Sequence, residues 1–167
     1  MDEPYYRVET YVARSSIGYL AKRVHALMHD CIEPAFANAG FTFMQWVVLK
    51  YVRDGIALNP KDICMEFRHD SGALTRVIDQ LETRGLVLRQ RSREDRRAIE
   101  LHLTDAGCET VDQLTPLVVG HLNTVLMDFS REEADELTRL LVKLLASMQR
   151  LIDEPAAHPE PSTQGVR

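Results

Sequence analysis

The segment 71–104 constrains the fold more than any other part of the chain. Residues 71–84 have a helical pattern that Gly85 ends, since glycine suits the left-handed position just past a helix. Two short strands are expected next, over residues 86–91 and 98–103, and in the second strand apolar and polar residues alternate. The turn between the strands is rich in arginine. A helix followed by an arginine-tipped hairpin predicts a winged helix that contacts DNA.

Asp95-x-Arg97, followed by Leu103-Thr104, resembles the D-x-R-x-x-x-x-x-L-T wing signature of the MarR family of transcriptional regulators. Three further segments resemble that family: Ser71-Gly72-Ala73-Leu74-Thr75-Arg76, Leu81-Glu82-x-x-Gly85-Leu86-Val87-x-Arg89, and Phe41-Thr42-x-x-Gln45-Trp46-x-x-Leu49. A looser similarity extends over residues 10–150. The resemblance implies a homodimeric winged helix-turn-helix regulator of transcription.

The N-terminal half of the chain is expected to be helical. A long helix is expected over residues 8–33, and Pro34 should kink or interrupt it. A second helix is expected over residues 43–53. Asn59 followed by proline predicts the start of a short helix over residues 60–67, because asparagine caps helices and proline suits their first position. With the helix from Ser71, these form a helix-turn-helix.

The C-terminal part is expected to form two more helices. The first runs from Thr104 to about Asp128, and Pro116 and Gly120 are expected to bend it. Ser130-x-x-Glu133 is a capping box that starts the second. A dense apolar stripe follows: Leu137, Leu140, Leu141, Leu144, Leu145, Met148, Leu151 and Ile152. The residues alone leave open whether the stripe forms a dimer interface or packs in an intramolecular helical hairpin, and the family resemblance favours the dimer.

The predicted fold class is therefore mainly α with a small β-hairpin wing: a winged helix-turn-helix flanked by dimerisation helices. One chain domain is expected over residues 1–167. Its dimerisation region comprises residues 5–40 and 104–153, and its DNA-binding region residues 41–103. The end, 154–167, lacks periodic apolar residues and is expected to be disordered.

The predicted DNA-binding residues lie on the recognition helix and the wing: Ser71, Gly72, Ala73, Thr75, Arg76, Arg93, Asp95, Arg96 and Arg97. On the helix, Arg76 is the candidate for paired hydrogen bonds to guanine in a major groove. In the wing, the resemblance implies that Arg97 enters a minor groove and that Asp95 braces it. The other two wing arginines are expected to meet phosphates.

A small-molecule effector is also implied by the resemblance, since similar proteins bind anionic, often aromatic, molecules between the dimer helices and the winged domain. The residues expected near such a crevice are Tyr11, Arg14, Ser15, Tyr19, Arg23, His25, Met44 and Trp46. An arginine or histidine would hold the carboxylate, and Trp46 or Tyr19 the ring.

Charge is distributed unevenly, although the formal net charge is −5. Residues 68–97 hold eight arginines against five acids, a balance of 8 − 5 = +3, whereas residues 128–160 hold four bases against eight acids, a balance of 4 − 8 = −4. An acidic body with a basic face is consistent with DNA binding. No apolar run is long enough for a membrane span and the N-terminus does not resemble a signal peptide, so a cytoplasmic location is expected.

Other functions have weaker support. No set of nucleophile, base and orienting group is present, so an enzyme is not expected. His25 and His29 lie four residues apart near Cys31, a spacing that could hold zinc, but no third ligand is positioned, and neither a metal nor a cofactor is expected. Two alternatives stay open: a helical, winged protein-interaction module, and a DNA-binding regulator without a ligand.

Overall fold

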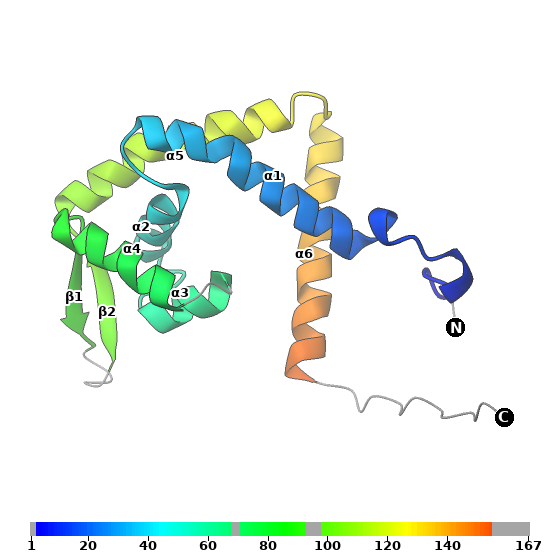
Figure 1. The fold of residues 1–167 in the computed structure, drawn as a ribbon, viewed down its shortest axis with the longest axis horizontal. Helices are drawn as coiled ribbons and strands as arrows, with labels where there is room; N and C mark the ends of the chain where they lie inside the picture. Colours follow the sequence, from blue (N-terminus) through cyan, green and yellow to red (C-terminus); the bar gives the residue numbers. More distant parts are fainter. Residues whose placement is uncertain (1–2, 68–70, 93–97, 155–167) are drawn as a thin grey trace. The chain divides into compact units, whose positions relative to one another are not determined.

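The computed structural model describes residues 3–67, 71–92 and 98–154. Its helices and strands are η1 (Val8–Thr10), η2 (Ala13–Ser15), α1 (Ile17–Asn38), α2 (Phe43–Asp54), α3 (Pro60–Phe67), α4 (Ser71–Thr83), β1 (Val87–Arg91), β2 (Ile99–Leu103), α5 (Asp105–Val125) and α6 (Arg131–Asp153). The chain divides into two compact units, residues 1–121 and 122–167. The fold is mainly helical with one antiparallel hairpin, which confirms the predicted fold class (Figure 1).

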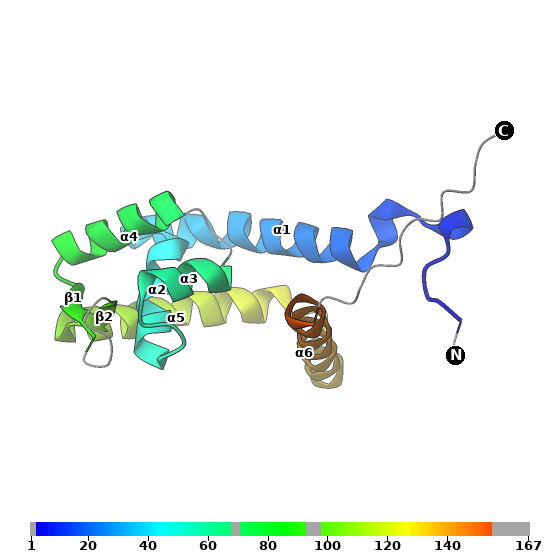
Figure 2. The same ribbon diagram turned by 90° about the horizontal axis from the view of Figure 1, so that it is seen from below.

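In the first unit, α2, α3, α4 and the β1–β2 hairpin pack around one apolar core (Figures 1 and 2). The fully buried members include Leu49 of α2, Ile63 of α3, Ile78 of α4 and Leu101 of β2. Cys64 packs against this cluster, as expected of a small apolar side chain. Since each helix contributes one apolar face to the same core, the core fixes α4 relative to its neighbours.

The hairpin pairs Val87 with Leu103 and Arg91 with Ile99. The amide of Leu101 also donates a hydrogen bond to the carbonyl oxygen of Leu58, at 2.6 Å, and this joins the loop before α3 to β2. The predicted strands are therefore confirmed to within a residue at their ends.

The start of the first long helix differs from the prediction. The segment 8–15 forms two 3-10 turns, and α1 begins at Ile17. Ser16 is extended and its hydroxyl accepts a hydrogen bond from the amide of Tyr19, so it caps the helix. The hydroxyl of Tyr6 accepts a second one from the amide of Ile17, at 2.8 Å. These two partners satisfy amide groups at the helix start and explain why α1 starts there.

Pro34 does not interrupt the first long helix, whereas the bends expected at Pro34, Pro116 and Gly120 stay predictions. Helix α1 continues through Pro34 to Asn38, and α5 contains Pro116. A proline removes one backbone hydrogen bond. In α1 the buried side chains of Ile32 and Phe36 flank Pro34 on both sides in sequence, and their packing offsets that loss.

The second unit holds α6, whose start confirms the predicted capping box. The Ser130 hydroxyl accepts from the amide of Glu133, and the Glu133 carboxylate accepts from the amide of Ser130. No residue of α6 is buried. Most of its apolar stripe is exposed, with Leu145 and Leu151 each 67% accessible.

Candidate nucleic-acid interface

Helix α4 has one buried face and one exposed face. Leu74, Ile78 and Leu81 are at most 2% accessible and anchor the helix in the core. Four of the predicted DNA-binding residues are exposed: Gly72, Ala73, Thr75 and Arg76. The exposed face therefore carries one arginine among small and hydroxyl side chains, a combination that allows close approach to a base edge.

The end of α4 is fixed by local hydrogen bonds. Gly85 has φ +69°, a conformation that glycine adopts without strain. Its amide donates to the carbonyl oxygen of Glu82, and the amide of Leu86 donates to that of Leu81. This arrangement ends the helix and turns the chain into the hairpin.

Three contacts tie α4 and the residue that follows it, Arg84, to the start of α2 and the turn before it. The Arg84 guanidinium lies over the Phe41 ring, 3.8 Å from its centre, and donates to the carbonyl oxygen of Gly40. The Gln45 side chain donates to the Gln80 side chain at 3.0 Å, while its own oxygen caps the start of α2. Gln45 therefore both caps α2 and holds α4 in place.

Arg89 on β1 connects the hairpin to α4. Its guanidinium donates to Asp79, at 2.5 Å, and to Glu82. The hydrogen bond with Asp79 is the main cause that raises the pKa of Arg89, the two carboxylate charges raise it further, and partial burial lowers it. We call this set of Arg89, Asp79 and Glu82 the Arg89 bridge.

The base of the hairpin is joined to α5 by Thr104. Its hydroxyl donates to the carbonyl oxygen of Gly85 at 2.7 Å and accepts from the amide of Gly107 at 3.0 Å. Gly107 packs against the backbone of Leu86. The Leu103-Thr104 pair of the wing signature therefore has a structural role at the hairpin base.

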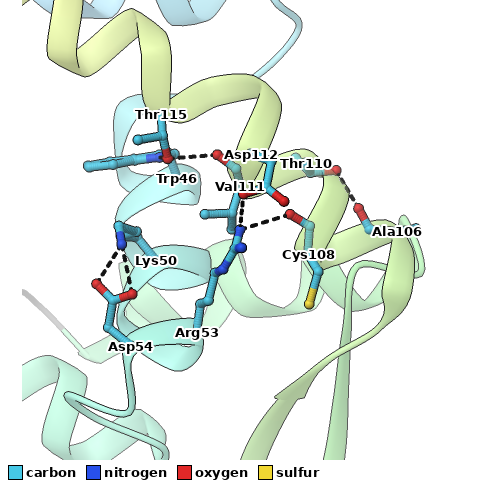
Figure 3. A network of polar contacts seen from close by, with 10 residues as sticks. All are labelled: Trp46, Lys50, Arg53, Asp54, Ala106, Cys108, Thr110, Val111, Asp112 and Thr115. Carbon is cyan, nitrogen blue, oxygen red and sulfur yellow. Dashed lines mark hydrogen bonds and ion pairs between the residues drawn. The ribbon is translucent and has the colours of Figure 1, made fainter.

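Helices α2 and α5 are joined by polar contacts shown in Figure 3. Arg53 donates to the Asp112 carboxylate and to the carbonyl oxygen of Cys108. The Trp46 indole nitrogen lies 3.5 Å from the Thr115 hydroxyl. Together these contacts connect the helix-turn-helix to α5.

The wing residues Arg93, Asp95, Arg96 and Arg97 lie outside the described residues. Just beyond the ends of β1 and β2, the amide of Ser92 donates a hydrogen bond to the carbonyl oxygen of Ala98, at 2.9 Å. Ser71 is the first residue of α4. Its contact with DNA stays a prediction, as do those of the wing.

The residues predicted to line a ligand crevice are distributed over three elements. Tyr11, Arg14 and Ser15 lie in the 3-10 region, Tyr19, Arg23 and His25 on α1, and all six are exposed. Met44 and Trp46 on α2 are partly buried. Tyr11 lines an open hollow near the N-terminus together with Tyr6, Arg7 and Val8.

Trp46 has an aromatic environment within the first unit. Its ring stacks on Phe43, with centres 5.6 Å apart, and lies 6.0 Å from the ring of Phe36. Phe36 is fully buried. The indole thus forms part of the packing between α1 and α2, and its partly exposed remainder is the portion that a ligand could reach.

The prediction from sequence missed the Arg89 bridge and the contacts of Arg84 and Gln45. A signal for the first was present, since Asp79 and Glu82 lie three apart on one helical face and Arg89 follows on the next strand. Among the described residues no group of three or more histidine, cysteine or acidic side chains is placed to hold a metal ion. In the same part of the chain, no helix is long and apolar enough to cross a membrane.

Comparisons with known proteins agree with this arrangement. A model of the MarR family matches residues 39–98. Two uncharacterised HTH-type transcriptional regulators of Bacillus subtilis are similar in sequence. YkoM is 35% identical over 82 residues, 49% of this chain and 53% of that protein, and YdgJ is 33% identical over 110 residues, 66% and 63% respectively. The chain thus spans less than two thirds of either relative.

Solved structures extend the similarity beyond the helix-turn-helix. A MarR variant from E. coli complexed with operator DNA is 26% identical, with a TM-score of 0.66 over 77% of this chain and 93% of that one. A Mycobacterium tuberculosis MarR family protein in complex with salicylic acid is 25% identical, with a TM-score of 0.67 over 78% and 96%. In its helices, its hairpin and its sequence motifs, this chain is similar to members of the MarR family.

Proposed function

We propose that this chain is a sequence-specific DNA-binding regulator of transcription that acts as a homodimeric repressor. The observation that carries the proposal is the exposed face of α4, which presents Thr75 and Arg76 while Leu74 and Ile78 anchor the opposite face. A helix held in this way can enter a major groove without rearrangement. The E. coli relative complexed with operator DNA supports it.

In this proposal, helix α4 and the wing contact different grooves of the DNA. Arg76 donates paired hydrogen bonds to guanine, and Gly72 and Ala73 allow the backbone to approach the DNA closely. Arg97 enters the adjacent minor groove, where a narrow groove attracts a guanidinium, and Asp95 braces it. Arg93 and Arg96 meet phosphates and add affinity without sequence information.

The homodimer is proposed from two exposed apolar stripes. On α1, Ile17, Leu20, Val24 and Leu27 are between 45% and 55% accessible at helical spacing. On α6 the stripe from Leu137 to Ile152 is exposed in the same way. Burial of such stripes against a second copy removes a large apolar area from water. A two-fold dimer would bind a pseudo-palindrome with half-sites about 10 bp apart.

We further propose that a small aromatic acid releases the repressor. The support is the Mycobacterium tuberculosis family member in complex with salicylic acid. Arg14 and Arg23 are the cations proposed for the carboxylate, and Trp46 and Tyr19 the partners of the ring. In the proposed dimer, the spacing of the two α4 helices decides whether DNA can bind. Release requires only that the ligand bind more tightly to the dimer with the wrong spacing than to the dimer that binds DNA. Such a regulator would act in the cytoplasm.

The proposal is tested by fluorescence anisotropy with a duplex from the region upstream of the protein's own gene. Binding is measured over a salt series, with and without a panel of aromatic acids. Tight, salt-dependent binding that one acid abolishes is the expected result. Tight binding that no acid affects would remove the effector from the proposal. Absence of specific binding to this duplex and to a randomised duplex pool would contradict the function itself.

A further inference from the structure

Arg89 lies on the face of the hairpin that packs toward the core. It is paired across the strands with Leu101, which is fully buried, and Val87, two residues earlier on the same face, is fully buried as well. Side chains two apart on a strand share one face. The aliphatic part of Arg89 therefore leaves the hairpin on its inner side, and 27% of its side chain is accessible.

The two acceptors of the Arg89 bridge come from one surface of α4. Asp79 and Glu82 lie three residues apart, so both carboxylates project toward the same side of the helix. One guanidinium nitrogen reaches Asp79 and the other reaches Glu82. A planar guanidinium can bind two carboxylates at once in this way, whereas a lysine ammonium is a single point charge.

These carboxylates adjoin the face of α4 that is proposed to bind DNA. Asp79 lies four residues after Thr75 and three after Arg76, so it shares their exposed side of the helix. Negative charge beside a phosphate backbone is unfavourable. Arg89 offsets one of the two negative charges and joins the hairpin to the helix with the same group.

We propose that Arg89 is a positioning residue of the DNA interface: it holds the β1–β2 hairpin against α4 through Asp79 and Glu82 and does not contact DNA itself. The inference rests on the proposed DNA-binding function. Arg89 thus has a task distinct from that of the arginines proposed to bind DNA.

The test uses a charge exchange within the bridge. Arg89→Glu places three carboxylates together and should abolish specific binding. Adding Glu82→Arg restores two acids and one arginine, now with the arginine on the helix, and should return most of the affinity. Arg89→Met removes the bridge without adding charge and should weaken binding about 3- to 30-fold, as expected of residues that act without touching the ligand.

Binding is measured by anisotropy on a duplex selected from a randomised pool by the wild-type chain. Circular dichroism at the same temperature shows that each variant is folded. Arg131→Met on α6 is the control for the loss of one positive charge, because Arg131 has a 90% accessible side chain in the other compact unit. The dependence of affinity on salt is recorded for every variant.

The salt dependence separates a positioning role from a contact. The slope of log affinity against log salt is negative, and each lost phosphate contact makes it less steep by about 0.9. Arg89→Met should leave the slope unchanged. Three results would each overturn the inference. They are a less steep slope in Arg89→Met, wild-type affinity in Arg89→Met, and a charge-exchange variant that binds as weakly as Arg89→Glu. If the wild-type chain selects no duplex, the proposed function fails first, and the positioning role fails with it.

Discussion

Gly107 at the start of α5 packs so closely on Leu86 that a β-carbon at position 107 would lie 2.1 Å from the Leu86 carbonyl oxygen. That oxygen also accepts a hydrogen bond from the amide of Thr104. A backbone atom cannot move aside as a flexible side chain can. The contact therefore fixes the distance between α5 and the segment that joins α4 to the β1–β2 hairpin.

Replacing Gly107 by alanine should destabilise the protein by about 1–3 kcal/mol, the usual range for overpacking a fixed site. Thermal unfolding followed by circular dichroism measures the change. Gly120→Ala in the same helix is the matched control, because an added β-carbon there meets nothing within 4 Å. The control should be neutral or stabilise the helix, by up to about 1 kcal/mol. Equal melting temperatures for the two variants would contradict the packing argument.

Local sequence signals predicted the elements that depend on neighbouring residues. Gly85 ends α4, Ser130 and Glu133 cap α6, and Asn59 accepts from the amide of Asp62 at the start of α3. Each of these features involves residues at most three or four apart, and such short-range preferences can be read from sequence.

Features that depend on distant residues were not predicted. Helix α1 starts at Ile17 partly because the Tyr6 hydroxyl, 11 residues earlier, accepts its amide hydrogen bond. Gln45 reaches Gln80 across 35 residues. Periodicity does not encode such contacts, because they arise only when the folded chain brings the partners together. The Arg89 bridge joins residues only 7 and 10 apart, but it crosses from a helix to a strand, and the periodicity within either element does not reveal it.

Removal of the arginine side chain at position 76 or 97 should weaken operator binding. For Arg76→Ala we expect a loss on the order of 1–3 kcal/mol with relaxed specificity at one base, since a paired hydrogen bond to guanine is lost. Arg97→Ala should weaken binding mainly at A·T-rich sites, whose narrow minor groove attracts the guanidinium. Anisotropy with operator and mutated duplexes measures both. Wild-type affinity in both variants would show that the winged helix is not the DNA-binding element.

The α6 stripe should determine the oligomeric state. Leu145→Glu places a charge in the middle of the exposed apolar surface and should convert a dimer into a monomer or an aggregate, as should truncation before Leu137. Lys143→Glu, outside the apolar stripe of the same helix, is the control and should stay dimeric, as should truncation after Glu154. Sedimentation velocity gives the mass of each. A stable monomer that binds DNA would refute the proposed interface.

The pair of Glu136 and Arg139 on α6 should make that helix sensitive to acid. Arg139 donates two hydrogen bonds of 2.6 Å to the Glu136 carboxylate, and these lower the pKa of Glu136 below its ordinary value of 4.5. A carboxyl group whose pKa is lower in the folded state stabilises that state above its ordinary pKa, and the stabilisation is lost as pH falls through the lowered value. Glu136→Gln and Arg139→Gln should each reduce the pH dependence of the melting temperature below about pH 4.5. An unchanged pH profile in both variants would show that the pair does not contribute.

Trp46 provides a direct test of the proposed effector site, because it is the only tryptophan in the chain. Its indole is partly buried beside Phe43, so an aromatic acid that binds near it should change the intrinsic fluorescence in a saturable way. Arg23→Ala should weaken that binding by about 1–3 kcal/mol if Arg23 holds the carboxylate, the usual range for a charged hydrogen bond. Lys61→Ala, an exposed cation on α3, is the control. Saturable quenching that is unchanged in Arg23→Ala and Arg14→Ala would assign the carboxylate to another cation, whereas the absence of saturation for every acid in the panel would contradict a ligand site at Trp46.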